Sequence, residues 1–287
     1  MKQTTLSEIT KGGQWIGLGI AGNQAGHLNQ AGEAEDFKDI VVVEHAPKGM
    51  FPWYIPQHDS FLGVNPLSSS ELFHNGETCL QPEPEMGLVV EFVYSDSSEQ
   101  LLDGMKVIGF TSMNDCSRRV AEKKISMKKN WGACSQGIAE AVYLLDDFEN
   151  KKGAISDYRL ASFLRRDGVL HAYGKDTAVV DYTYFDKQLV DWMTNQINQQ
   201  QDEGPLEELN NMLGAEKFQY GVIAIGATAY EDFGNSEERF LRVNDEVFVV
   251  LYDSSEHSST EVIAMLNSEE AAPKSGVILL HQCVVDM

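Results

Sequence analysis

The sequence predicts an α+β fold in which strands and helices do not alternate regularly. Runs rich in Val, Ile, Phe and Tyr are typical of strands, and they lie at residues 86–94, 106–112, 177–184, 220–227 and 246–252. Their spacing is too irregular for a repeated strand-helix unit. Residues 139–145 and 186–199 are predicted to be helical. The second helix carries Leu189, Met193 and Ile197 at four-residue steps on one face.

The N-terminal part of the chain differs from the rest because glycine and proline interrupt it repeatedly. Its short apolar pieces, which include residues 40–43 and the turn-rich residues 51–56, predict a small α+β lobe over residues 1–75. The strand-like runs follow it and predict a β-rich domain over residues 76–287, which would carry the functional site. A chain of 287 residues can form one large domain or two modest ones with a sizeable core.

The charge of the chain is strongly acidic, with 22 Lys and Arg against 44 Asp and Glu and a formal net charge of −22. Such a surface repels nucleic acid and anionic lipid, so neither is expected as a partner. Basic residues concentrate only between Arg118 and Lys129. We interpret this segment as attracting a small anionic substrate, and a solvated helix face is the alternative.

The cysteines, at positions 79, 116, 134 and 283, form neither a C-x-x-C pair nor a zinc-finger spacing. This usage fits a reducing compartment. The first residues lack the apolar core of a signal peptide, and no apolar run approaches the roughly 18 residues of a membrane span. We therefore expect a cytoplasmic protein.

Glu83 and Glu85 are separated by one residue, and Asp115 follows 30 positions after Glu85. Side chains at i and i+2 of a strand share a face, and the apolar run from Met86 to Val90 predicts that strand. Two carboxylates so close repel each other unless a cation neutralises them. Mg²⁺, Mn²⁺ and Ca²⁺ all prefer oxygen ligands, so the pattern predicts a divalent-cation site, with a solvated acidic face as the alternative.

Several further segments occur in the order and spacing of one family's motifs. Residues 81–90 resemble a W-E-x-E-L-x-V-V strand, and residues 108–119 resemble a G-Y-x-x-x-N-D-x-S-x-R block. Residues 129–131, 221–228 and 241–247 resemble the K-S-F, G-D-V-I-x-T-G-T-P and L-x-x-G-D-x-V segments that follow. Together these segments resemble the motifs of the fumarylacetoacetate hydrolase family, of which the chain would be a divergent member.

This resemblance implies a mixed β-roll with peripheral helices and a homodimer. It also implies that Glu83, Glu85 and Asp115 hold the catalytic cation, with Mg²⁺ favoured and Mn²⁺ or Ca²⁺ as alternatives. The same motifs place Lys129 beside the developing enolate as a fixed positive charge. They make Arg119 and Thr228 substrate-binding residues, although Ala227 occupies the position of the family's threonine.

The segment at residues 23–30 resembles the family's N-Y-x-x-H-x-x-E, in which a His–Glu pair activates water. His27 takes the place of the histidine, and imidazole suits general-base catalysis at neutral pH. Gln30 stands where the glutamate is expected, and an amide can orient the imidazole but cannot act as a base. Glu33 is not expected to replace it, because position i+6 lies well round a helix from His27.

The specific prediction is a metal-dependent hydrolase that cleaves a C–C bond in a small 1,3-dicarbonyl or acylpyruvate-type acid. Because of Gln30, two alternatives remain open: a 2-oxo acid decarboxylase or isomerase of the same fold, and a catalytically silent relative that still binds metal or ligand. A remote alternative is a Rossmann-type oxidoreductase, since residues 17–22 match G-x-G-x-x-G and Glu44 lies 22 residues beyond Gly22. The polar, glycine-broken residues 10–16 argue against the buried strand that such a motif requires.

Overall fold

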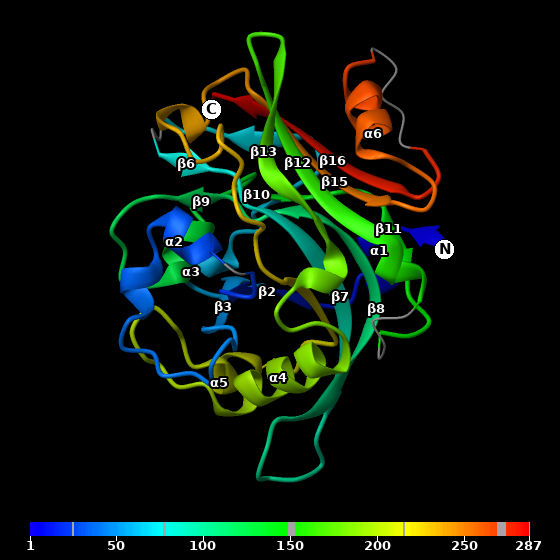
Figure 1. The fold of residues 1–287 in the computed structure, drawn as a ribbon. Coiled ribbons are helices and arrows are strands. Elements are labelled where there is room, and N and C mark those ends of the chain that lie inside the picture. Colours follow the sequence, from blue (N-terminus) through cyan, green and yellow to red (C-terminus); the bar gives the residue numbers. More distant parts are fainter. Residues whose placement is uncertain (25, 77–78, 149–152, 215, 269–273, 287) are drawn as a thin grey trace.

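The computed structural model describes the chain except for residues 25, 77–78, 149–152, 215, 269–273 and 287 (Figure 1). The strands are β1 (Gln3–Thr4), β2 (Trp15–Ala21), β3 (Gly49–Tyr54), β4 (Leu67–Ser68), β5 (Glu71–Phe73), β6 (Leu80–Gln81), β7 (Pro84–Tyr94), β8 (Leu102–Asn114), β9 (Ser117–Arg118), β10 (Gln136–Ile138), β11 (Val142–Leu144), β12 (Tyr158–Arg166), β13 (Val169–Ala178), β14 (Tyr220–Ala224), β15 (Glu246–Asp253) and β16 (Val277–Val285). The α-helices are α1 (Leu6–Thr10), α2 (His27–Ala31), α3 (Ile125–Lys129), α4 (Asp186–Gln199), α5 (Leu209–Gly214) and α6 (Ser259–Leu266). The 3₁₀ turns are η1 (Ala34–Phe37), η2 (Phe61–Gly63), η3 (Ala154–Asp157), η4 (Val179–Asp181) and η5 (Glu237–Arg239).

Two sheets built around the long β7–β8 hairpin dominate the fold. The larger sheet has the order β1-β11-β8-β7-β14-β2-β3, with β10 joining β8 to β4, and the second has the order β13-β12-β15-β16-β5. Figure 1 shows the second sheet lying over β7 and β8, with α4 and α5 at the far end of the hairpin. Ser112 on β8 links the sheets, because its hydroxyl donates to the Ile278 carbonyl oxygen at 2.9 Å. This mixed arrangement with peripheral helices confirms the predicted α+β class.

The helix predicted at residues 186–199 is confirmed as α4, whose buried face carries Leu189, Met193 and Ile197. The predicted strands at 86–94, 106–112, 220–227 and 246–252 correspond to β7, β8, β14 and β15. A strand at 177–184 is wrong, because β13 ends at Ala178 and η4 follows. Tyr182 in this segment is buried, and its hydroxyl donates a hydrogen bond to the Gly226 carbonyl oxygen.

The helix predicted at residues 139–145 is also wrong, since residues 142–144 form β11. Tyr143 pairs with Phe110 of β8 on one side and with Gln3 of β1 on the other. Pairing to two neighbouring strands outweighs the local helical preference of the flanking Ala and Glu residues.

The G-x-G-x-x-G segment lies mostly inside a strand and does not form a phosphate-binding turn. Gly17 and Gly19 are in β2, where an added Cβ would come within 2.3 Å of the Trp53 ring at Gly17 and of the Phe51 ring at Gly19. These glycines therefore make room for aromatic rings of β3. Residues 40–43 form no strand, and Val41 is 95% exposed. The structure contradicts the Rossmann alternative.

Strands from both sides of residue 75 share the larger sheet, since β2 pairs with β14 and β14 pairs with β7. The boundary between a 1–75 lobe and a 76–287 domain stays a prediction. Of the helices within the described residues, none has the length and apolar character needed to cross a membrane.

Candidate metal centre

The β7–β8 hairpin brings the three predicted carboxylate ligands together. Glu83 directly precedes β7, Glu85 is its second residue, and Asp115 directly follows β8. Pro84 pairs with Asn114, and the Asp115 amide donates to the Glu83 carbonyl oxygen at 2.9 Å. One carboxylate oxygen from each of the three residues lies within 4.8 Å of the others. We call this group the carboxylate cage.

The carboxylate cage is buried, with exposed fractions of 4% for Glu83, 2% for Glu85 and 1% for Asp115. Burial raises the pKa of Glu85 well above its usual value, and the nearby Asp115 and Glu83 carboxylates raise it further. Burial alone would also raise the pKa of Glu83, but the charges of Lys129 and Arg119 hold it well below its usual value. The surroundings of Glu85 therefore favour its neutral form unless a further cation lies beside it.

Two buried cations lie against the cage. Lys129, at the end of α3, places Nζ 2.7 Å from Asp115 Oδ2 and 3.0 Å from Glu83 Oε2. Arg119 Nη2 lies 2.7 Å from Glu83 Oε1. Burial lowers the pKa of Lys129, but Asp115 and Glu83 outweigh burial and raise it above the usual value. Lys129 thus places a buried positive charge against the cage, and its role beside a developing enolate stays a prediction.

An unsatisfied oxygen shows that these residues fit a metal ion. Asp115 Oδ1 is buried and finds no hydrogen-bond donor among the described residues, although Lys129 lies beside Oδ2. Buried polar atoms without partners are rare in folded proteins. The adjoining cavity has a volume of about 10 Å³, which is roughly the space of one water molecule. Hard oxygen donors around a space of this size suit Mg²⁺, Mn²⁺ or Ca²⁺.

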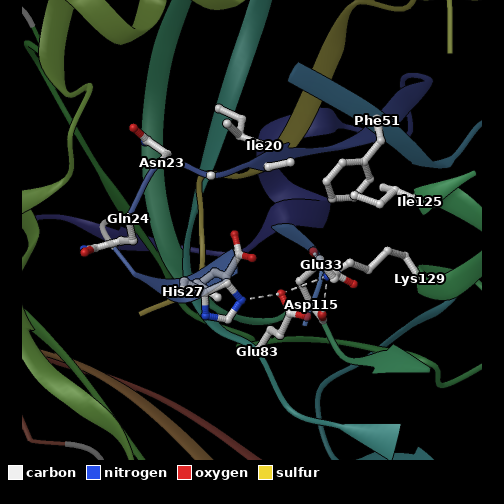
Figure 2. Close-up of a pocket in the computed structure, with 14 residues that line it drawn as sticks. Ile20, Asn23, Gln24, His27, Glu33, Phe51, Glu83, Asp115, Ile125 and Lys129 are labelled. Atoms are coloured by element: carbon white, nitrogen blue, oxygen red, sulfur yellow. Dashed lines mark hydrogen bonds and ion pairs between the residues drawn. The ribbon is translucent and has the colours of Figure 1, made fainter. Parts of the chain in front are cut away.

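The cavity gathers side chains from distant parts of the chain (Figure 2). His27, Glu33, Glu83, Asp115 and Lys129 point toward one another there. The remaining lining residues are Ile20, Ala21, Gly22, Asn23, Gln24, Phe51, Glu85, Ile125 and Ala227.

His27 begins α2 and is held at both ring nitrogens. Nδ1 lies 3.0 Å from the Thr228 carbonyl oxygen, and Nε2 lies 3.3 Å from Glu83 Oε2. A carbonyl oxygen only accepts, so Nδ1 carries a proton and donates it. Glu83 Oε2 is also an acceptor, so its contact with Nε2 is a hydrogen bond only when Nε2 carries a proton as well. Nε2 is therefore the ring nitrogen at which a proton can be held or passed on within the cavity.

Gln30 does not orient His27 in the way the sequence suggested. Its amide oxygen accepts from the Tyr230 backbone amide at 2.8 Å, and its amide nitrogen donates to the Tyr230 carbonyl oxygen at 3.4 Å. Both groups of the amide are therefore engaged with the backbone of the segment after β14. The catalytic role assigned to Gln30 stays a prediction, and the geometry points to anchoring of α2.

Glu33 is the functional candidate that the sequence reasoning dismissed. α2 ends at Ala31, and Gly32 has a positive φ of 74°, which turns the chain. Glu33 is therefore not part of the helix, and its position relative to His27 does not follow from helical spacing. The buried Glu33 carboxylate lines the cavity together with His27. Arg119 Nη1 lies 2.8 Å from Glu33 Oε1, and Lys128 Nζ lies 3.5 Å from it. The glycine after α2 is the signal that could have indicated this turn.

The two predicted substrate-binding residues do not line the cavity. The Arg119 guanidinium contacts Glu33, Glu83, the Gln81 side-chain oxygen at 2.8 Å and the Tyr230 hydroxyl at 3.0 Å. The Thr228 hydroxyl lies close to the backbone of Gly174, since a Cβ added there would come within 2.6 Å of Thr228 Oγ1. Ala227 lines the cavity instead. Substrate contacts from Arg119 and Thr228 stay predictions.

A buried carboxyl group behind α3 makes the stability of the fold depend on pH. Burial raises the pKa of Glu207 from 4.5 to about 7, and Ser126 donates a hydrogen bond to it. The native state therefore keeps a proton that the unfolded chain releases. The stability from this protonated form is fully present below pH 4.5 and is lost as the pH rises through 7.

We therefore expect Glu207→Gln to remove a pH-dependent loss of stability. As the pH rises from about 4.5 to 8, the difference in free energy of unfolding between the variant and the wild type should shift in favour of the variant by up to about 3 kcal/mol. Urea denaturation at a series of pH values measures the difference. Glu216→Gln, at an exposed position, is the control. Parallel pH profiles for wild type and Glu207→Gln would contradict the assignment.

Comparison with known proteins shows where the chain belongs. It is a member of the family described as "Family of unknown function (DUF5718)", which matches residues 33–284. No curated protein matches the chain.

Solved structures show the same fold at low sequence identity. Cg1458 with an inhibitor has a TM-score of 0.54 and 18% identity, covering 95% of this chain and 77% of that one. The 5-carboxymethyl-2-hydroxymuconate delta-isomerase from Mycobacterium smegmatis has a TM-score of 0.53 and 12% identity, with coverages of 95% and 79%. A 2-keto-3-deoxy-D-arabinonate dehydratase complexed with magnesium and 2,5-dioxopentanoate has a TM-score of 0.50 and 13% identity, with coverages of 100% and 83%. The fold is thus fumarylacetoacetate-hydrolase-like, as the sequence predicted.

Proposed function

We propose that this chain is a divalent-metal-dependent enzyme acting on a small oxo acid. The observation that carries the proposal is the buried carboxylate cage, in which Asp115 Oδ1 has no donor among the described residues. A structural neighbour that is a dehydratase holds magnesium and 2,5-dioxopentanoate, and another is a 5-carboxymethyl-2-hydroxymuconate delta-isomerase. Both descriptions support an oxo-acid substrate for this fold.

Glu83, Glu85 and Asp115 would hold the cation, and Mg²⁺ is the ion we propose, with Mn²⁺ or Ca²⁺ as alternatives for the same oxygen ligands. When bound, the cation would supply Lewis-acid polarisation of the substrate's carbonyl oxygens. An anionic 1,3-dicarbonyl or 2-oxo acid is the substrate class that this chemistry suits. The buried charge of Lys129 adds to it by stabilising negative charge that develops beside the cage.

His27 is the residue we propose to move a proton. Its Nδ1–H is committed to the Thr228 carbonyl oxygen, so Nε2, which faces the cavity beside Glu83 Oε2, is the nitrogen that would take up or release the proton. Glu33 lines the same cavity and would contribute a buried carboxylate that Gln30 cannot provide. Hydrolytic cleavage of a C–C bond is the specific reaction that we propose, with His27 taking the proton of the attacking water.

A second candidate is decarboxylation or enol–keto isomerisation, for which no attacking water is needed. The engagement of the Gln30 amide with the Tyr230 backbone favours it, because the water-activating pair of the resembled family is then incomplete. A homodimer and a cytoplasmic location remain predictions from the sequence.

The test is an assay of the purified chain with Mg²⁺ or Mn²⁺ against acylpyruvates, fumarylpyruvate and oxaloacetate. Ultraviolet absorbance follows loss of the enol form, and NMR identifies products, so that cleavage, decarboxylation and isomerisation are distinguished. We expect turnover that disappears in Glu83→Gln. Activity that survives this substitution would contradict the metal mechanism. Metal binding without turnover of any of these substrates would favour a catalytically silent relative.

A further inference from the structure

A second cluster of metal-ligating side chains lies outside the cavity, on the second sheet where β15 and β16 pair. Glu246, His281 and Cys283 each offer one ligand atom, and these atoms lie within 4.8 Å of one another. Cys283 is exposed, the Glu246 side chain is 28% exposed and the His281 side chain is 41% exposed. Solvent ions can therefore reach the cluster directly.

The sheet register explains why these side chains converge. Glu246 on β15 is the direct partner of Cys283 on β16, and directly opposed side chains share a face at close range. His281 lies two residues before Cys283, which places it on the same face. Glu71 on β5 is the partner of Cys283 on the other side, so a second carboxylate flanks the thiol. Strand pairing therefore fixes the positions of these side chains, and no loop has to move to bring them together.

Neighbouring side chains hold two of these ligands in orientation. Arg165 Nη1 donates to both Glu246 oxygens at 3.0 Å, and its guanidinium lies over the Phe248 ring at 4.8 Å. The His281 ring stacks on Phe248 with centroids 4.4 Å apart and an interplanar angle of 16°. Hydrogen bonds to a ligating carboxylate and a fixed imidazole are what tuned metal sites show around their ligands.

We propose that Glu246, His281 and Cys283 form a binding site for a borderline-soft cation of the zinc class, separate from the carboxylate cage. The set of one sulfur, one nitrogen and one oxygen suits Zn²⁺, with water completing a tetrahedral site. The Cys283 thiolate and the Glu246 and Glu71 carboxylates, offset by the one positive charge of Arg165, balance the two charges of Zn²⁺. Binding replaces the His281 Nε2 to Glu246 Oε2 hydrogen bond of 2.8 Å and releases the thiol proton to solvent.

Cobalt(II) titration of the purified full chain tests the site, since thiolate ligation gives a charge-transfer absorption that carboxylate ligation does not. We expect this absorption in the wild type and its displacement by added Zn²⁺. Cys283→Ser should abolish it, and circular dichroism checks that this substitution at an exposed position leaves the fold intact. Cys79→Ser is the control thiol substitution, because Cys79 lies outside the cluster.

Asp115→Asn separates this site from the proposed enzyme centre, because it should remove hard-cation binding and leave the thiolate absorption intact. His281→Gln should weaken Co²⁺ binding without removing the thiolate signal. Absence of the absorption in the wild type, or its persistence in Cys283→Ser, would overturn the proposal. Neither result would bear on the carboxylate cage.

Discussion

Replacing Arg119 with methionine is expected to lower the free energy of unfolding of the metal-free protein by about 3–5 kcal/mol, because two buried carboxylates each lose their shortest ion pair. Arg119 pairs with Glu33 at 2.8 Å and Glu83 at 2.7 Å, and all three side chains are at most 9% exposed. Water cannot reach the carboxylates to compensate. Urea denaturation in the presence of a chelator measures the loss.

The control for this experiment is Arg242→Met, which removes a surface ion pair with Glu238. Both of those side chains are 55% exposed, and such pairs contribute about 1 kcal/mol or less. Combining Arg119→Met with Glu33→Gln should recover part of the loss, because one uncompensated charge is removed. Equal stability of Arg119→Met and Arg242→Met would contradict the proposed role of Arg119.

Replacing Asp115 with asparagine is expected to weaken Mn²⁺ binding to the carboxylate cage by at least about 100-fold. Loss of an outer partner of a metal ligand already costs roughly 10–100-fold, and Asp115 is itself a proposed ligand. The amide also removes one of the two strongest attractions for Lys129. Isothermal titration calorimetry with Mn²⁺ measures the affinity.

Glu207→Gln is the matched control, because Glu207 is also buried but lies outside the cage. It should bind Mn²⁺ as the wild type does. Unchanged Mn²⁺ affinity in Asp115→Asn would show that the cation binds elsewhere. Equal loss in both variants would indicate a general effect of removing a buried carboxylate.

The position of the carboxylate cage could be predicted because it depends on local rules. Alternation along a strand places Glu83 and Glu85 on one face, and the apolar run after them marks β7. Pairing of β7 with β8 then brings Asp115 alongside, which the order of motifs indicated. α4 could be predicted for the same reason, since its buried face repeats with the helical period.

Other features depend on contacts between distant segments and could not be predicted in this way. Residues 142–144 form a strand only because β8 and β1 flank them. The ion pair of Glu33 with Arg119 joins residues 86 positions apart, and the turn at Gly32 that makes it possible was missed. Cys283 and Glu246 likewise share a site through sheet register, which the cysteine spacing does not reveal.

A crystal structure of the wild type soaked with Mn²⁺, with anomalous scattering recorded for manganese, shows directly whether the carboxylate cage binds a cation. We expect an anomalous peak about 2.0–2.6 Å from oxygens of Glu83, Glu85 and Asp115. Well-ordered carboxylates with no anomalous peak between them at saturating Mn²⁺, neutralised by Lys129 and Arg119 alone, would contradict this expectation.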